Sequence, residues 1–145
     1  MLRKYLTVGA VALLAAGTVG FAAGTTYRVA DSRVYELRTY TVLPGRLPAL
    51  HKRFAEHTMA IFERHGMRNE MYWVPLDSAR RENTLIYVIS HESREAADRN
   101  WQAFASDPEW IVARDASEAD GKILAKAPER VFMTRTEYSP SAARR

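Results

Sequence analysis

The order of β-rich and helical segments between residues 33 and 138 constrains the fold most strongly. Segments rich in β-branched and aromatic residues span 33–42, 67–75, 84–91 and 130–138. Helical periodicity occupies residues 47–65 and 94–118, with a restart at Asp107-Pro108. This β-α-β-β-α-β order predicts a ferredoxin-like α+β domain, in which a four-stranded antiparallel sheet carries its helices on one face.

Local sequence signals support these boundaries. Pro44-Gly45 interrupts the first β segment, and Gly66 follows the first helix where a C-cap glycine belongs. Ser93 is placed to cap the second helix, while Asp107 and Pro108 suit the N-cap and first turn of its continuation. Because a short charged loop joins the second and third β segments, we expect those two strands to form a hairpin.

Alternation along the strands predicts which side chains face the helices. Ile86 and Val88 form a purely apolar set in the third strand, so we expect them on the helix side. The mixed polar and aromatic set is expected on the helix-free face: Glu36, Arg38, Tyr40, Tyr87 and His91, with one of Tyr72 and Trp73. So much aromatic surface favours burial against a second copy, sheet to sheet, around a small cavity.

The composition excludes several classes of protein. The chain has 145 residues, which suits one domain, and 26% charged with 47% hydrophobic residues excludes intrinsic disorder. The absence of cysteine excludes disulfides, cysteine-ligated metal sites and a cysteine nucleophile. The core of such a chain has to hold without covalent cross-links, and we expect a second subunit to complete it.

Residues 1–24 have the layout of an export segment. Arg3 and Lys4 precede an uncharged run from Leu6 to Ala23, and small residues close it, which is typical of a signal peptide cleaved near Ala23 or Gly24. The run is also about long enough to span a bilayer as an uncleaved N-terminal anchor. We therefore predict an exported protein, periplasmic or secreted, or one held at the membrane by this segment alone.

The net charge of +4 is partly a property of that segment. Its removal takes away two basic residues and no acidic one, so the remaining chain carries about +2. This charge, without a basic stripe, does not indicate nucleic-acid binding. We divide the remaining chain into a polar linker at 25–32, a domain at 33–140 and a disordered tail at 141–145.

A series of short motifs runs along the domain: YELRTY at 35–40, Pro44-Gly45, HGM at 65–67, YW at 72–73, SREAA at 93–97, WQAF at 101–104, DPEW at 107–110 and TEYSP at 136–140. Their order and spacing resemble the NIPSNAP family. The resemblance implies a homodimeric α/β barrel without a cofactor and without an established common activity. The export-like N-terminus and the single domain are similar to a bacterial exported member, so the mitochondrial roles of animal members are not carried over.

Candidate site residues come from the set expected on the helix-free face. We take Glu36, Arg38, Tyr40, Trp73, Tyr87 and His91 as candidate ligand-binding residues, with His91 and Tyr40 as candidate catalytic groups. Arginine can grip a carboxylate and histidine titrates near neutral pH, although an interface ion pair and a strand-end histidine would explain the same residues. His51, His57 and His65 lie on the first helix without metal-ligand spacing, so no metal site is expected.

Three functions remain open on this pattern. The first is binding of a small ligand or protein partner, without catalysis, in the cavity of a homodimer. The second, by analogy of fold, is a cofactor-free monooxygenase or isomerase, or a haem-binding enzyme with His91 as the axial ligand. The third is an assembly module whose barrel interior is filled with side chains.

Overall fold

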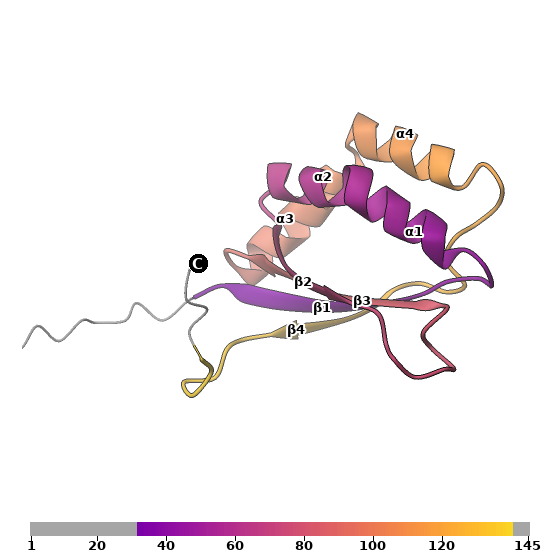
Figure 1. Ribbon diagram of the computed structural model, residues 1–145. Helices are drawn as coiled ribbons and strands as arrows, with labels where there is room; N and C mark the ends of the chain where they lie inside the picture. Colours follow the sequence, from indigo (N-terminus) through magenta and orange to yellow (C-terminus); the bar gives the residue numbers. More distant parts are fainter. Residues whose placement is uncertain (1–31, 141–145) are drawn as a thin grey trace, which may run out of the picture.

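A four-stranded antiparallel sheet organises the structure, a computed structural model that describes residues 32–140 (Figure 1). The strands are β1 (Val34–Thr41), β2 (Arg68–Trp73), β3 (Thr84–His91) and β4 (Glu129–Met133), in the spatial order β2-β3-β1-β4. The predicted ferredoxin-like order and the β2–β3 hairpin are thus confirmed. β4 ends at Met133 rather than at the predicted Tyr138, because Met133 pairs with Tyr35 at the beginning of β1.

The predictions for the two ends of the chain lie outside the described residues. They concern the export segment at 1–24, nearly all of the linker at 25–32 and the tail at 141–145, and they stay predictions. Within residues 32–140, no helix is long and apolar enough to cross a membrane.

The first helix is continuous but changes its winding near its middle. It consists of α1 (Leu47–Arg53), a π-helical turn η1 (Phe54–Thr58) and α2 (Met59–Arg64). The wider turn is closed by the Met59 backbone N–H, which donates to the Phe54 carbonyl five residues earlier. The helix ends at Gly66 as predicted: its φ of +75° is readily adopted only by glycine, and Met67 then donates to the Phe62 carbonyl at 2.9 Å.

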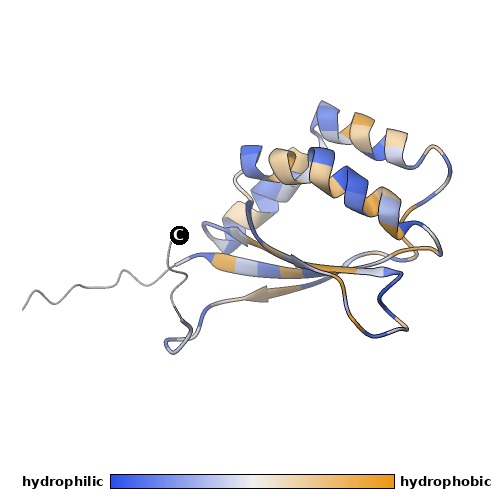
Figure 2. Ribbon diagram, in the orientation of Figure 1, coloured by the Kyte–Doolittle hydropathy of each residue, from blue (hydrophilic) through white to orange (hydrophobic). Residues whose placement is uncertain are grey.

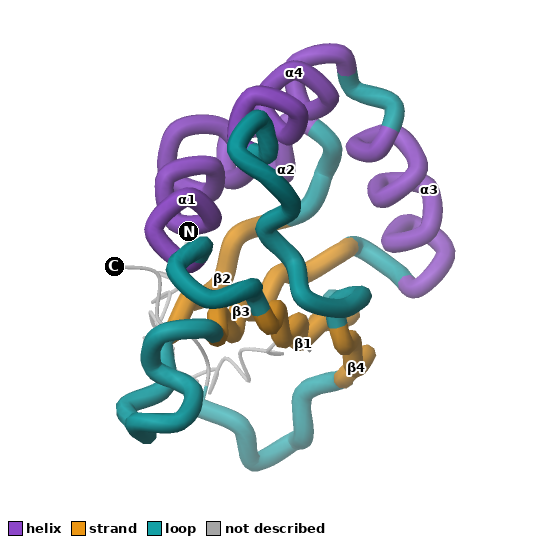
Figure 3. Tube along the Cα trace, turned by 90° about the vertical axis from the view of Figure 1, so that its right-hand side faces the viewer, coloured by secondary structure: helices purple, strands orange, loops and turns teal. Residues whose placement is uncertain are grey.

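The second helical region is divided into α3 (Arg94–Ala105) and α4 (Pro108–Ser117). The Ser93 hydroxyl accepts from the Ala96 backbone N–H, and an Asp107 oxygen accepts from the Glu109 backbone N–H, so both predicted caps are confirmed. α3 contacts β3, whereas α4 packs on the first helix and on α3, which makes it the outer helix of the layer (Figures 1 and 3).

The predicted facing of the strands is wrong. The Tyr87 ring lies against Phe54 and Phe62 of the first helix, with centroid distances of 5.2 Å and 6.1 Å, and Trp101 of α3 bonds to Glu36. Residues paired across strands share a face, so the whole mixed set lies under the helices: Glu36, Arg38, Tyr40, Tyr87 and His91. The polar members of this set can be buried because they bond to one another.

The opposite side of the sheet carries no helix within the described residues, and we call it the open face (Figures 1 and 2). Most of its residues are uncharged and apolar: Tyr35, Leu37, Thr39, Met71, Trp73, Ile86, Val88, Val131 and Met133. Charge occurs toward its ends, where Glu129 pairs with Thr39 and Arg68 pairs with Ser90. Ile86 and Val88, expected on the helix side, are part of it. Trp73 remains 47% exposed and Val131 54% exposed in the single chain, so this surface is apolar and largely uncovered.

Asp107 joins the ends of two helices, which yields a test of the helical layer. Besides capping α4, its Oδ2 accepts from Arg64 Nη2 at 2.8 Å and bonds to His65 Nε2 at 2.6 Å. These hydrogen bonds hold the pKa of Asp107 well below its usual range.

We expect Asp107→Ala to lower the midpoint of thermal unfolding clearly, and Asp107→Ser, which can still cap α4, to lower it less. Because the lowered pKa makes the ionised form part of the folded state, this contribution is lost as the pH falls toward the folded-state pKa. Asp98→Ala, which removes an exposed carboxylate paired with Arg94, is the control and should change little. If all three variants lowered the unfolding midpoint equally, Asp107 would not have the stabilising role that we assign to it.

Candidate functional site

A buried cluster of charged and aromatic groups lies between β1, β3 and α3. At its centre is the Glu36 carboxylate, which has no exposed surface. Arg38 Nη1 donates to Oε1 at 2.8 Å, while Trp101 Nε1 and His91 Nε2 lie 2.7 Å and 3.0 Å from Oε2. Because both oxygens are bonded, Glu36 positions its neighbours rather than offering an acceptor to a ligand.

The hydrogen bonds around Glu36 determine the protonation states. Burial raises its pKa, but the bonds from His91, Trp101 and Arg38 together hold the pKa below the ordinary value of 4.5. An ionised carboxylate only accepts, so His91 Nε2 carries the proton that it donates. The other ring nitrogen, Nδ1, lies 3.3 Å from Asn100 Nδ2, within hydrogen-bond distance. Both nitrogens of the fully buried His91 are therefore occupied.

Arg38 is held between two aromatic rings. Its guanidinium carbon lies 4.2 Å from the Trp101 ring centroid and 5.5 Å from that of Tyr40, and the residue is only 9% exposed. One terminal nitrogen bonds to Glu36, but the buried Nε has no hydrogen-bond partner within residues 32–140. Arg38 is therefore the member of the cluster with unused donor capacity.

The two tyrosines of the cluster, Tyr40 and Tyr87, are hydrogen-bonded to each other. Tyr87 donates its hydroxyl proton to the Tyr40 oxygen at 3.1 Å, and its ring stacks on Tyr72 with a centroid distance of 5.2 Å. Burial, with the neighbouring Tyr40, raises the pKa of Tyr87 well above its usual value. Its phenol therefore stays neutral at physiological pH, as a packing and hydrogen-bonding group.

The edge of the cluster next to β4 carries further cations. Arg130 pairs with Arg38 across the strands and Phe132 pairs with Glu36, so both lie on the helix side of β4. The guanidinium of Arg94, from the first turn of α3, lies 3.9 Å from the Phe132 ring centroid, and that of Arg130 lies 5.6 Å from it. Arg130 is exposed and Phe132 half-buried, so this rim can be reached from solvent.

The family of the chain follows from its match to a family sequence model. The model of NIPSNAP matches residues 35–140, which is most of the chain and nearly all of the described part. The chain belongs to the NIPSNAP family. The resemblance drawn from the short motifs is thereby confirmed.

Solved structures of bacterial NIPSNAP proteins have the same fold. A NIPSNAP-like domain protein from Burkholderia xenovorans is 17% identical, with a TM-score of 0.63, and the match covers 76% of this chain and 90% of that one. A NIPSNAP family protein of unknown function from Agrobacterium tumefaciens is 20% identical, with a TM-score of 0.62, over 76% and 94% of the two chains. No curated protein matches the sequence. These likenesses establish the fold and leave the function to the site itself.

The NIPSNAP domain brings together five of the six residues expected at the site. Glu36, Arg38, Tyr40, Tyr87 and His91 form one cluster, but inside a single chain under the helices, not in a cavity on the helix-free face. Trp73 does not belong to the cluster, because it pairs with Ile86 on the open face, and Tyr72 takes its place beside Tyr87. Trp73 instead lines a separate cavity of about 200 Å³ at the β2 edge, together with His51, Met59 and Tyr72.

The two candidate catalytic groups do not face a cavity. His91 is fully buried with both nitrogens bonded, and Tyr40 is 8% exposed and bonded to Tyr87. A haem iron would need an open nitrogen on an accessible histidine, so His91 does not fit the role of axial ligand. Among residues 32–140, no group of three His, Cys, Asp or Glu side chains is placed to hold a metal ion.

The sequence did not identify the helical and β4 residues that complete the cluster. They are Arg94, Asn100, Trp101, Arg130 and Phe132. Trp101 packs against the hydrophobic core, and its indole N–H also binds Glu36. The spacing of polar and aromatic residues in the fourth strand could have identified Arg130 and Phe132, had the register with β1 been known.

Proposed function

We propose that this NIPSNAP protein is a homodimer that binds a small organic anion at Arg38, on the helix side of each sheet. One observation carries the ligand site: a buried guanidinium, fixed by Glu36 and Trp101, has an Nε without a partner. A buried donor that stays unbonded is costly, and an arginine fork matches a carboxylate. An anion that reaches Nε would therefore satisfy a group that the chain itself leaves unsatisfied.

The rim beside β4 supports an anion with a flat apolar body. Arg94 and Arg130 add positive charge at the edge of the cluster, and the Phe132 ring lies beneath them. Charge at the entrance raises the local concentration of anions, and an aromatic face can pack against a planar ligand. The Glu36 carboxylate does not compete with the anion for Nε of Arg38, because both of its oxygens are already bonded to other groups.

The open face supports the homodimer. A two-fold contact brings the same surface of each chain onto itself, so it requires a surface without like charges at its centre. The middle of the open face meets this condition, with Leu37 and Thr39 of β1 beside Ile86 and Val88 of β3. The export expected from residues 1–24 belongs to the same proposal, which places the dimer outside the cytoplasm. The catalytic alternative has no comparable support, since His91 and Tyr40 face the core.

Titration with benzoate and with the uncharged, similarly shaped benzamide tests the ligand site by isothermal calorimetry. We expect benzoate to bind more tightly, and Arg38→Gln to weaken it by roughly tenfold to a hundredfold, the range for a hydrogen bond to a charged group. Arg130→Gln, at the exposed rim, should weaken it by a smaller factor. Arg80→Gln, in an exposed pair with Asp77, is the matched control. Equal binding of benzoate and benzamide, or unchanged binding by both site variants, would contradict the proposal.

A further inference from the structure

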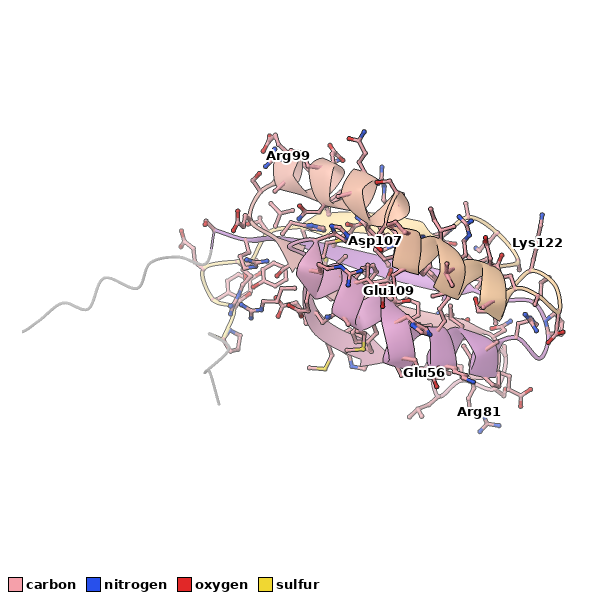
Figure 4. All side chains as sticks on the ribbon, turned by 90° about the horizontal axis from the view of Figure 1, so that it is seen from above. Glu56, Arg81, Arg99, Asp107, Glu109 and Lys122 are labelled. Carbon is pink, nitrogen blue, oxygen red and sulfur yellow. The ribbon has the colours of Figure 1, made fainter. Side chains whose placement is uncertain are left out.

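The first helix and α4 enclose a second cavity, remote from the Arg38 cluster. Its volume is about 250 Å³, and it is lined by Ala49, Lys52, Arg53, Glu56 and His57 of the first helix with Ala113, Ala116 and Ser117 of α4. Small alanine side chains on both helices leave the space between them. Figure 4 shows the two helices side by side above the sheet, with Glu56 labelled on the first helix and Glu109 near the beginning of α4.

The base of this cavity contains a buried cation with unused donors. Arg53 is 4% exposed, and its guanidinium lies 5.1 Å from the Trp110 ring centroid. Nη1 donates to the Ser117 hydroxyl at 3.1 Å and makes a long contact of 3.4 Å with the partly exposed Glu118. Nε is buried without a hydrogen-bond partner in the described part of the chain. The positive charge of Arg53 is therefore only loosely paired.

The mouth of the cavity is mainly basic. Lys52 is exposed and His57 is partly exposed, and both line the opening above Arg53. Glu56 is the one acid among the lining residues, and its carboxylate lies 4.0 Å from the His57 ring. A negatively charged group that enters the cavity thus meets the buried cation Arg53, with Lys52 at the opening and the Glu56 carboxylate beside His57.

The π-helical turn contributes directly to this cavity. Glu56 and His57 lie within η1, and Arg53 directly precedes it and accepts, through its carbonyl, the Thr58 hydroxyl at 3.2 Å. A π turn has poorer backbone geometry than an α turn and is frequently found at functional sites. Two of the side chains that line the cavity thus belong to this π turn.

From these observations we infer a second binding site, between the first helix and α4, for a small aliphatic carboxylate whose head group bonds to Arg53. The arginine fork matches a carboxylate, and the alanine walls suit an apolar chain. The volume is close to that of about eight water molecules, which is room for a carboxylate head group with a short apolar chain. The site shares no residue with the Arg38 cluster, so it does not depend on the function proposed above.

Calorimetric titration with hexanoate, and with hexanamide as its uncharged counterpart of equal size, tests this inference. We expect hexanoate to bind at least tenfold more tightly than hexanamide. Arg53→Gln should weaken hexanoate binding at least tenfold, whereas Arg80→Gln, in an exposed pair with Asp77, should leave it unchanged. Ala116→Leu, which places a larger side chain in the lining of the cavity and leaves Arg53 in place, should also weaken binding and covers the case in which Arg53→Gln fails to fold.

Two matched controls accompany these variants. Arg114→Gln changes a partly exposed arginine of α4 that pairs with Asp115, and Ala103→Leu adds the same bulk at an exposed position of α3. Both should bind hexanoate like the unchanged protein. The inference is overturned if hexanamide binds as well as hexanoate, if Ala116→Leu binds normally, or if folded Arg53→Gln binds hexanoate like the unchanged protein.

Discussion

Val88→Glu is expected to convert the homodimer that we propose into a folded monomer. Val88 lies near the middle of the open face, where its cross-strand neighbours are Leu37 and Met71. In a two-fold contact each subunit would bury a glutamate without a partner, close to the same residue of the other subunit. A buried unpaired charge costs several kcal/mol, so the dissociation constant should rise by roughly a thousandfold. Sedimentation equilibrium over a range of protein concentrations measures this dissociation constant.

The matched control for this variant is Val112→Glu. Val112 is 69% exposed on the outer helix α4, so the same substitution there should leave the mass of the assembly unchanged. Ile86→Glu, at a neighbouring position of the open face, should reproduce the monomer. A monomeric unmodified protein, or a dimer that survives both substitutions in β3, would contradict the assignment of this face.

Glu36→Gln is expected to destabilise the fold more than any other change of one charge in the cluster. The substitution keeps the shape of the side chain but leaves Arg38 buried without its counter-charge, and it adds an amide N–H₂ facing donors. Breaking a buried ion pair from one side costs about 3–5 kcal/mol. Urea unfolding followed by circular dichroism measures the change, with Glu82→Gln in the exposed loop after β2 as the matched control.

A double variant separates lost attraction from unpaired charge. Replacing Arg38 with methionine in the Glu36→Gln background removes both charges, and replacing both partners of a buried pair is often nearly neutral. The double variant should therefore be more stable than Glu36→Gln alone, a non-additive result expected for residues in contact. If the loss of stability in the double variant equalled the sum of the losses in the two single variants, Glu36 and Arg38 would not be coupled as their distance implies.

The same pair predicts a pH dependence of stability. The folded-state pKa of Glu36 is lowered, so its contribution is fully present above the ordinary value of 4.5 and is lost as the pH falls toward the folded-state pKa. The unmodified protein should lose stability faster than Glu36→Gln below about pH 4.5, so the difference between them narrows on acidification. If the difference in unfolding free energy between the two proteins stayed constant from pH 7 to pH 3, the predicted pH dependence would be wrong.

The order of the elements could be predicted because each had its own local signal. Gly66, Ser93 and Asp107 occur where backbone groups at helix ends need them, and all three caps are found in the structure. Alternation also placed Glu36, Arg38 and Tyr40 correctly on one face of β1. The π turn at Phe54–Thr58 had no such signal, since its residues continue the apolar stripe of an ordinary helix.

The direction in which that face points could not be predicted from one strand at a time. In β3, both alternating sets are apolar enough for a core: Ile86 with Val88, and Leu85 with Tyr87 and Ile89. The polar residues of β1 are then expected on the helix-free face, against a second copy of the chain. They are buried because Trp101, from a helix about 65 residues away, donates to Glu36 and stacks on Arg38. Burial of a charged residue depends on such distant partners, which no local pattern contains.

The central claim is that the two faces of the sheet have separate roles, the open face in assembly and the helix side in ligand binding. Native mass spectrometry of the unmodified protein, Val88→Glu and Arg38→Gln in the presence of benzoate tests it most directly. We predict a dimer with two benzoates, a monomer with one, and a dimer with none, respectively. If either substitution removed both the dimer and the benzoate from a folded protein, both functions would lie on one surface, and the account would be contradicted.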